Sequence, residues 1–238
     1  MEIRERLLQL KFEFRSRVAR EPWLSPLHRL IVWWTQYKMI GHIDIHECRV
    51  GPKTEFVLDG FQGTANSFAT RAFKYAQEDF VRIAHHLHSP AQIIEAVQRD
   101  IPTLVTLRNP KDAVASLISR WPYVTPQQGL RSYVKFYRKI EPYTGDFVLS
   151  PFNQTTQHLD RAFRAVNEQF GTQFDVFEHS EQNVRAIRDP KSLQSDEEMR
   201  RQERKSKVKN QLAKSRYTAA VREANEVHQR LLSHGLEA

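Results

Sequence analysis

The sequence predicts an α/β protein in which helices cover both faces of a central parallel sheet. Two observations in the 238-residue chain support this fold class. From about residue 55 to residue 175, short apolar segments alternate with amphipathic helical segments, as in repeated β–α–β units. One apolar segment, PTLVTLR at 102–108, has the composition of a strand buried on both faces. No internal repeat is evident, so we expect a single domain over 1–238 with its core at about 50–180.

Four strands and four helices are expected in this core. Ser89 and Pro90 are suited to the cap and first turn of the second helix, and Gly171 is suited to end the last one. The expected strands cover 55–60, 81–87, 102–108 and 145–152, and the expected helices cover 66–80, 89–100, 110–121 and 156–170.

The N-terminal part of the chain, 1–45, predicts two helices. Apolar residues recur at helical spacing over 4–20 and 26–40. The most apolar run, which contains Trp33 and Trp34, is too short to span a membrane, and no stretch typical of a signal peptide is present. We therefore expect a core helix, no membrane span and a cytoplasmic protein. An interfacial anchor or a pocket wall for an acceptor, built on the two tryptophans, are the alternatives.

Positive charge dominates the composition and the C-terminal segment. The chain has 36 lysines and arginines against 28 acidic residues, a net charge of +8, which favours an anionic partner such as a nucleotide, nucleic acid or acidic lipid. In 181–238 no strand is expected, and the basic stretch 199–216 predicts either a solvated helix or a flexible flap over an anionic ligand. The single cysteine, Cys48, excludes a disulfide within the chain and argues against a cysteine-built metal site.

The first chemical signal is the loop that joins the first expected strand to the next helix. Its sequence, GFQGTANSF, contains Gly60 and Gly63, which permit close backbone approach. Backbone N–H groups and the helix dipole at such a junction form a cradle for an anion, as in a P-loop, although Asn66 stands where a triphosphatase has lysine. An ordinary capped turn is the alternative. The candidate binding residues are Gln62, Gly63, Thr64, Ala65, Asn66, Ser67 and Phe68.

The second signal is LRNPKDAVASL, which puts Arg108 at the end of the third strand and Ser116 in the following helix. Arginine grips a phosphate through two parallel hydrogen bonds, and serine adds a neutral one. Because parallel sheets bind ligands beyond the carboxyl ends of their strands, we expect Arg108 and Ser116 to converge with the first loop. A helix-capping pair of Arg108 with Asp112 is the alternative.

Together the two loops resemble the sulfotransferase family, whose members use 3′-phosphoadenosine 5′-phosphosulfate. The resemblance covers roughly residues 55–175. It implies a P-loop-like three-layer sandwich in which the first loop holds the 5′-phosphosulfate and Arg108 and Ser116 hold the 3′-phosphate. It also implies sulfuryl transfer to a hydroxyl or amine without a metal. A later segment, ERKSK, is similar to a family loop on the 3′-phosphate and implies Arg204 and Lys205 as further ligands.

The first loop departs from the P-R-S-G-N-S form of the family pattern. Gln62 stands at the proline position and Gly63 at the position of the Lys or Arg. The cation that steadies the leaving 5′-phosphate is therefore missing from its usual place. Arg71 and Lys74, on the following helix, or residues of the basic tail are candidates to replace it.

A histidine cluster, IAHHLHSP, follows the second expected strand. Sulfuryl transfer needs a base for the acceptor's proton, and neutral histidine suits that role near pH 7. The resemblance implies His86 as this base, with His88 as a second catalytic candidate. Strand alternation predicts His85 and His86 on opposite faces and His86 and His88 on the same face. Surface or capping histidines are one alternative, and a zinc site without an evident third ligand is another.

The function predicted is sulfuryl transfer, with a nucleotide cosubstrate and an unidentified acceptor as partners. Phe152, after the fourth strand, is a candidate to stack on the purine, or else a core residue. Two other classes stay open. A P-loop nucleotide kinase or triphosphatase is disfavoured by the missing lysine. A nucleic-acid-binding module would use the basic C-terminal segment, but no recognised motif supports it.

Overall fold

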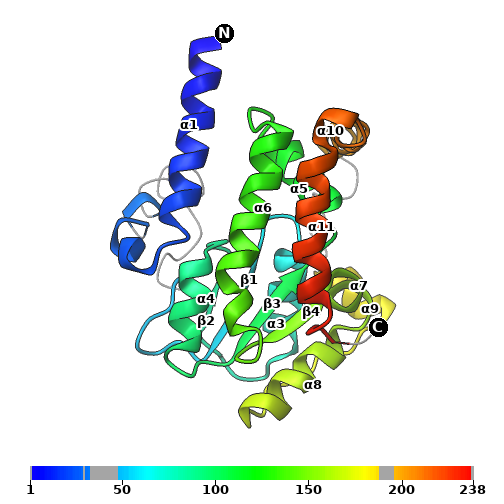
Figure 1. The fold of residues 1–238 in the computed structure, drawn as a ribbon. Helices are drawn as coiled ribbons and strands as arrows, with labels where there is room; N and C mark the ends of the chain where they lie inside the picture. The colour runs from blue at the N-terminus through cyan, green and yellow to red at the C-terminus, as the bar shows by residue number, and fades with distance from the viewer. Residues whose placement is uncertain (1, 29, 33–47, 188–195, 237–238) are drawn as a thin grey trace.

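The computed structural model describes residues 2–28, 30–32, 48–187 and 196–236. At its centre lies a four-stranded sheet, which confirms the α/β class (Figure 1). Every pair of neighbouring strands is parallel, and the order across the sheet is β2–β1–β3–β4. The strands are β1 (Phe56–Gly60), β2 (Ile83–His85), β3 (Thr103–Leu107) and β4 (Val148–Pro151).

The strand order brings the carboxyl ends of β1 and β3 side by side, with Gly60 paired to Thr106. From β1 the chain passes to β2 on one side and then returns to β3 on the other. Open parallel sheets bind ligands where successive connections leave in opposite directions, because the loops there diverge and leave a crevice. In this sheet the connections diverge between β1 and β3, so the loops that follow these two strands lie at that position.

Helices cover both faces of the sheet and make three layers. On one face Val105 and Leu107 share an apolar core with α4, α5 and α6. On the other face Phe56, Leu58 and Leu104 share a core with α3 and α8. Alternate residues of β3 thus point into different cores, which explains why the whole strand is buried. These helices are α3 (Asn66–Ala76), α4 (Pro90–Val97), α5 (Pro110–Arg120), α6 (Pro126–Ile140) and α8 (Leu159–Phe170).

The expected core elements are present, with shorter bounds. The Ser89 side chain caps α4 by accepting a hydrogen bond from the backbone of Gln92. Gly171 ends α8 in the left-handed conformation, with φ of +65°. The helix expected over 156–170 is divided in two, because α7 (Phe152–Gln157) precedes α8.

The structure contains one core helix, α6, that we did not expect from the sequence. It begins with a capping box, in which the side chains of Thr125 and Gln128 each accept a hydrogen bond from the other's backbone. Pro126 occupies its first turn. The helix then buries Tyr133 and Tyr137, whose hydroxyls donate to the carbonyls of Arg108 and Thr106. The local signals for this helix are strong. Through its two tyrosines, α6 stabilises the C-terminal end of β3.

The N-terminal region forms α1 (Glu2–Val18), as expected, and then the 3-10 helix η1 (Pro22–Leu24). Residues 25–28 and 30–32 are also helical, which agrees with the first part of the helix expected over 26–40. The rest of that helix, including Trp33 and Trp34, lies outside the described residues. No helix of the described ranges is apolar over the length that crossing a bilayer requires.

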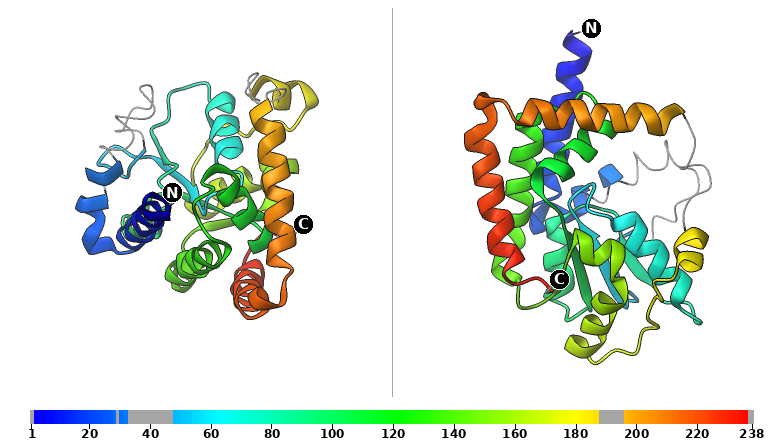
Figure 2. Two further views of the ribbon diagram at one scale, coloured as in Figure 1. Left: turned by 90° about the horizontal axis from the view of Figure 1, so that it is seen from above. Right: turned by 90° about the vertical axis from the view of Figure 1, so that its right-hand side faces the viewer.

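Up to residue 236, no strand follows β4 in the part of the chain that the structure describes. Helices α10 and α11 pack against α5 and α6 (Figure 2). Of the two alternatives for the basic stretch, the structure shows the helix rather than the flap, because Val208 and Leu212 of α10 are buried in the core shared with α5 while most of its other residues are exposed. The remaining elements are η2 (Glu141–Tyr143), α9 (Glu181–Ile187), α10 (Asp196–Leu212), η4 (Ser215–Tyr217) and α11 (Thr218–Leu232).

Candidate functional site

The loop between β1 and α3 lies directly against α5. Gly63 has a φ of +84°, and a Cβ atom on it would lie 2.6 Å from Cβ of Ser116. Only a glycine permits this approach without displacement of the loop or the helix. Ala65 also adopts a left-handed conformation, with φ of +75°, at the N-cap of α3. The two sequence motifs, one after β1 and one after β3, therefore meet as we expected.

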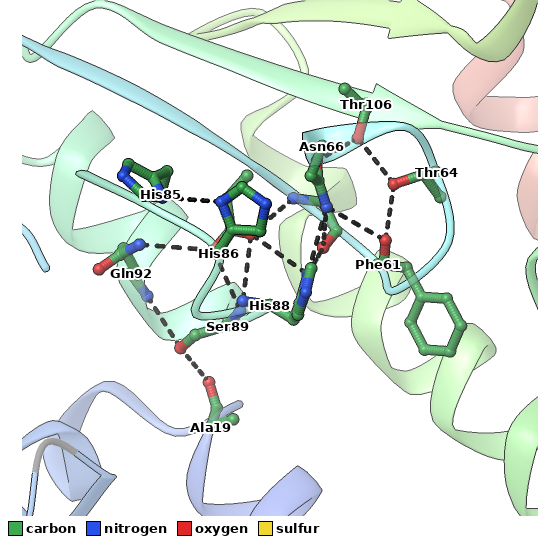
Figure 3. A network of polar contacts seen from close by, with 12 residues as sticks. Ala19, Phe61, Thr64, Asn66, His85, His86, His88, Ser89, Gln92 and Thr106 are labelled. Atoms are coloured by element: carbon green, nitrogen blue, oxygen red, sulfur yellow. Dashed lines mark hydrogen bonds and ion pairs between the residues drawn. The ribbon is translucent and has the colours of Figure 1, made fainter. Parts of the chain in front are cut away.

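Polar side chains inside the loop brace it rather than face a ligand. Thr64 is fully buried, and its hydroxyl donates to the carbonyl of Phe61 at 2.6 Å and lies 2.7 Å from the hydroxyl of Thr106. Asn66 donates to the carbonyl of Gly60 at 3.1 Å and accepts from Thr106 at 2.6 Å (Figure 3). The side chains of Thr64 and Asn66 thus hold the shape of the loop. What the loop offers an anion is its backbone N–H groups, since the first-turn amides of α3 have no intrahelical acceptor.

Arg108 connects the end of β3 to this loop. Its Nη1 donates to the carbonyl of Gly63 at 3.0 Å, and its guanidinium carbon lies 3.8 Å from the centroid of the Phe152 ring. Phe152, our candidate for purine stacking, thus supports the guanidinium in this structure. The Nε atom of Arg108 is buried and has no hydrogen-bond partner. Burial lowers the pKa of Arg108, and Asp112 opposes this shift. A half-buried cation with an unused donor is suited to an anionic ligand.

Helix α10 brings further cations toward Arg108. Burial lowers the pKa of Lys205, with repulsion from Arg201, Arg120 and Arg108 adding to the shift. Arg201, Arg204 and Lys205 are spaced by three or four residues from one another and from the buried Val208, so all four lie on one face of α10. That face is apolar near the C-terminal end of the helix and cationic in the turns before Val208.

Two of these cations carry unused donors, since the Nε atoms of Arg201 and Arg204 are buried without a hydrogen-bond partner. Glutamates on α10 partly neutralise the face: Arg204 lies 2.8 Å from Glu197, and Lys205 lies 3.8 Å from Glu198. Arg201 was not among our candidates, although its spacing from Lys205 and Val208 was the signal for it.

The histidines form a compact cluster beside the loop, but not as strand alternation predicts. Nδ1 of His85 lies 2.7 Å from Nδ1 of His86, so these two side chains touch instead of lying on opposite faces. The expectation was wrong because β2 ends at His85, and His86 and His88 have φ of +60° and +51°. Nε2 of His86 lies 2.9 Å from Oγ of Ser67, at the start of α3. His88 is turned inward, with Nδ1 at 2.8 Å from the carbonyl of Gly60.

A buried carboxyl group that our candidates did not include holds the histidine turn to the loop. Asp59, the only acid in the buried run of β1, accepts hydrogen bonds from the backbone of Gly60, His88 and Ser89 at 2.9, 3.1 and 3.3 Å. Gln92 of α4 donates to it at 3.4 Å. Burial raises the pKa of Asp59 to about 7, against the opposing effect of these donors. A lone acid in an apolar strand was the sequence signal for this group.

The histidines are neutral at pH 7 in this environment. Burial lowers the pKa of His86 to about 4, and the nearby cations Arg120, Arg71 and Lys74 add to the shift. Arg71 and Lys74 are the residues that we considered as replacements for the missing loop cation, and both act electrostatically on His86. Burial also lowers the pKa of His85 and His88, to about 3 in each case. A neutral imidazole beside several cations can accept a proton once an anion compensates their charge.

The structure also has a cavity beside the second motif, which it touches at Lys111. About 680 Å³ in volume, it lies between α10, α11 and the start of α5, and none of our candidate binding or catalytic residues lines it. In the described ranges, no group of three or more His, Cys, Asp or Glu side chains is arranged to hold a metal ion. No protein-family model, no curated protein and no solved structure matches the chain.

Proposed function

We propose that this protein is a sulfotransferase that moves a sulfuryl group from 3′-phosphoadenosine 5′-phosphosulfate to a hydroxyl or amine acceptor. The observation that carries the proposal is the direct contact of the two loops. Arg108 donates to the carbonyl of Gly63 at 3.0 Å, and Gly63 packs on Ser116 at the ligand-binding edge of a parallel sheet. One ligand with anionic groups at both ends can engage both loops at once.

The residues present fit such a ligand. The backbone N–H groups of 62–68 and the dipole of α3 suit the 5′-phosphosulfate. Arg108, with its buried unused Nε donor, suits the 3′-phosphate, assisted by Ser116 and by Arg204 and Lys205 of α10. Ser116 is almost fully buried and lies against Gly63, where α5 meets the loop.

His86 is suited to remove the acceptor's proton. For Nε2 to accept it, His86 keeps its own proton on Nδ1 and donates it to Nδ1 of His85, 2.7 Å away. The acceptor displaces Ser67 from Nε2. Its oxygen or nitrogen forms a bond to sulfur while the bridging sulfur–oxygen bond breaks, its proton goes to Nε2, and the electron pair leaves on the 5′-phosphate. The cations Arg71, Lys74 and Arg120 compensate that charge in place of the missing loop cation. His88, bonded to the loop carbonyl of Gly60, positions the turn.

Ligand binding tests this proposal. Adenosine 3′,5′-bisphosphate should raise the melting temperature and bind by calorimetry, whereas ATP with Mg²⁺ should do so weakly. Loss of the desolvated Arg108 contact in Arg108→Ala should weaken bisphosphate binding by about 2 kcal/mol, or roughly 30-fold. Arg138→Ala, which removes an arginine paired with Glu223 at the surface of α6, is the matched control and should bind normally.

Three outcomes would overturn the assignment. Equal binding by Arg108→Ala and the native chain would remove Arg108 from the site. Binding of ATP with Mg²⁺ and none of the bisphosphate would instead indicate a P-loop kinase or triphosphatase. Salt-sensitive binding of DNA or RNA that survives Arg108→Ala would indicate a nucleic-acid-binding module on the basic C-terminal segment.

A further inference from the structure

Helix α1 carries an exposed apolar stripe. Ile3, Leu7, Leu10 and Phe14 follow one another at intervals of four, three and four residues, so they lie on one side of the helix. Their exposed fractions are 78, 61, 62 and 56%. We call these four residues the α1 stripe. Single exposed apolar side chains are common on protein surfaces, but a continuous row of them marks a surface that binds a membrane or another protein.

The body of this protein does not cover the stripe. Phe12, on the opposite side of α1, makes the contact with the core, and Val18 is buried at the C-terminal end of the helix. Just after the helix, the carbonyl of Ala19 accepts hydrogen bonds from the hydroxyl of Ser89 at 2.6 Å and the backbone of Ala91 at 3.2 Å. The base of α1 is therefore attached to α4, while its N-terminal turns extend away from the sheet (Figure 1).

Exposed apolar groups are concentrated in this part of the molecule. Among the described residues, seven large hydrophobic side chains exposed by more than a third lie between Ile3 and Leu30, and four lie in all the rest. One of the seven is Trp23 of η1, with an exposed fraction of 77%. Tryptophan is the side chain most typical of the boundary between lipid headgroups and acyl chains.

The charges beside the stripe select the kind of surface that fits it. By the helical period, Arg6 and Arg17 lie along one side of the stripe and Arg4 and Lys11 along the other, all four exposed. Of the described acids of α1, Glu5 lies on a different side of the helix, and Glu13 accepts a hydrogen bond from Gln128 of α6 at 2.9 Å. An apolar stripe with cations on both sides is the arrangement of a helix that lies on an anionic membrane.

A second copy of the chain fits the stripe less well. Packing two stripes together would form a short coiled coil, in which the positions beside the apolar seam face each other. Three of the four such positions between Ile3 and Phe14 are cationic, namely Arg4, Arg6 and Lys11, so like charges would oppose one another. The net charge of +8 adds to that repulsion and favours an anionic surface.

We propose that α1 docks this protein on an anionic membrane surface, with the α1 stripe at the boundary between headgroups and acyl chains and the flanking cations on lipid phosphates. The inference does not depend on the proposed sulfuryl transfer. Because α1 is bonded through Ala19 to Ser89, next to His88, docking would bring the loops of the candidate site close to the bilayer.

Vesicle binding by the full chain tests the inference. The protein should sediment with vesicles of phosphatidylcholine containing about one third phosphatidylglycerol, and much less with phosphatidylcholine alone. The double variant Leu7→Gln and Leu10→Gln should weaken this binding at least tenfold, since it removes two apolar groups from the bilayer contact. Phe80→Gln with Met199→Gln, which removes side chains exposed to 71 and 67% elsewhere, is the matched control and should bind within about twofold of the native chain.

Each of the other outcomes would overturn the inference. They are no binding of the native chain to either vesicle, equal loss of binding in the control variant, and a dimer in light scattering that the Leu7 and Leu10 substitutions dissociate. The last outcome would assign the stripe to a second copy. Thermal unfolding shows that each variant folds, because all four substituted side chains are exposed and should leave the melting temperature nearly unchanged.

Discussion

Replacing Gly63 with alanine tests whether the loop after β1 touches α5. Alanine at a φ of +84° costs about 1–2 kcal/mol, because its Cβ crowds its own backbone. The same Cβ would lie 2.6 Å from Cβ and 2.8 Å from Oγ of Ser116, and overpacking of that kind costs about 1–3 kcal/mol. We therefore expect Gly63→Ala to lower the free energy of unfolding by about 2–5 kcal/mol, measured by urea denaturation.

Two further variants separate these contributions. Gly171→Ala has a φ of +65° and no atom within 4 Å of the added Cβ, so it should show the backbone cost alone. In a double-mutant cycle, Ser116→Gly should restore at least about 1 kcal/mol to Gly63→Ala, because it removes both crowding atoms. If Gly63→Ala costs no more than Gly171→Ala and shows no coupling to Ser116→Gly, the two loops do not meet and the proposed site is wrong.

Three other predictions follow from the contacts of the loop. Thr106→Val should lower the free energy of unfolding in urea by about 1–3 kcal/mol, since it leaves Asn66 Oδ1 buried without its donor and removes one of the two polar contacts of the Thr64 hydroxyl. An unchanged free energy of unfolding would show that these side chains do not brace the loop. By NMR titration, His86 should stay neutral down to about pH 4 in the free protein, and adenosine 3′,5′-bisphosphate should raise this pKa; a free value near 6.5 would contradict the burial. The pKa of Asp59 is about 7 in the folded protein and 3.8 in the unfolded chain, so its protonated carboxyl contributes fully to stability below about pH 4 and loses that contribution as the pH rises to 7. Asp59→Asn should therefore gain stability relative to the native chain between pH 4 and pH 7. Urea midpoints of the two proteins that run parallel over this range would contradict the prediction.

The sheet and its loops were predictable because their signals are local. The apolar run of β3, the cap at Ser89 and the end of α8 at Gly171 each depend on a few neighbouring residues. The approach of Arg108 to the first loop was also predictable, since carboxyl ends of parallel strands share one edge. The same local signals marked α6, where Thr125 and Gln128 form a capping box that we did not use.

The histidine turn was not predictable in this way. Its left-handed residues are His86 and His88, and the turn is held by hydrogen bonds from the backbone of His88 and Ser89 to Asp59, which is distant in the sequence. Alternation along a strand says nothing once the strand has ended. Similarly, the inward face of α10 depends on where that helix lies against α5, and no window of sequence contains both helices.

By itself, then, the sequence determined that the chain forms a parallel α/β sheet and that two loops with the chemistry for an anion leave it at one edge. Local propensity and strand direction suffice for that. Only the tertiary structure decided that Asn66 turns inward, that His85 touches His86, and that α1 leaves its apolar stripe uncovered. Burial and hydrogen-bond partners come from residues far apart in the chain, so they become known only when the layers are packed together.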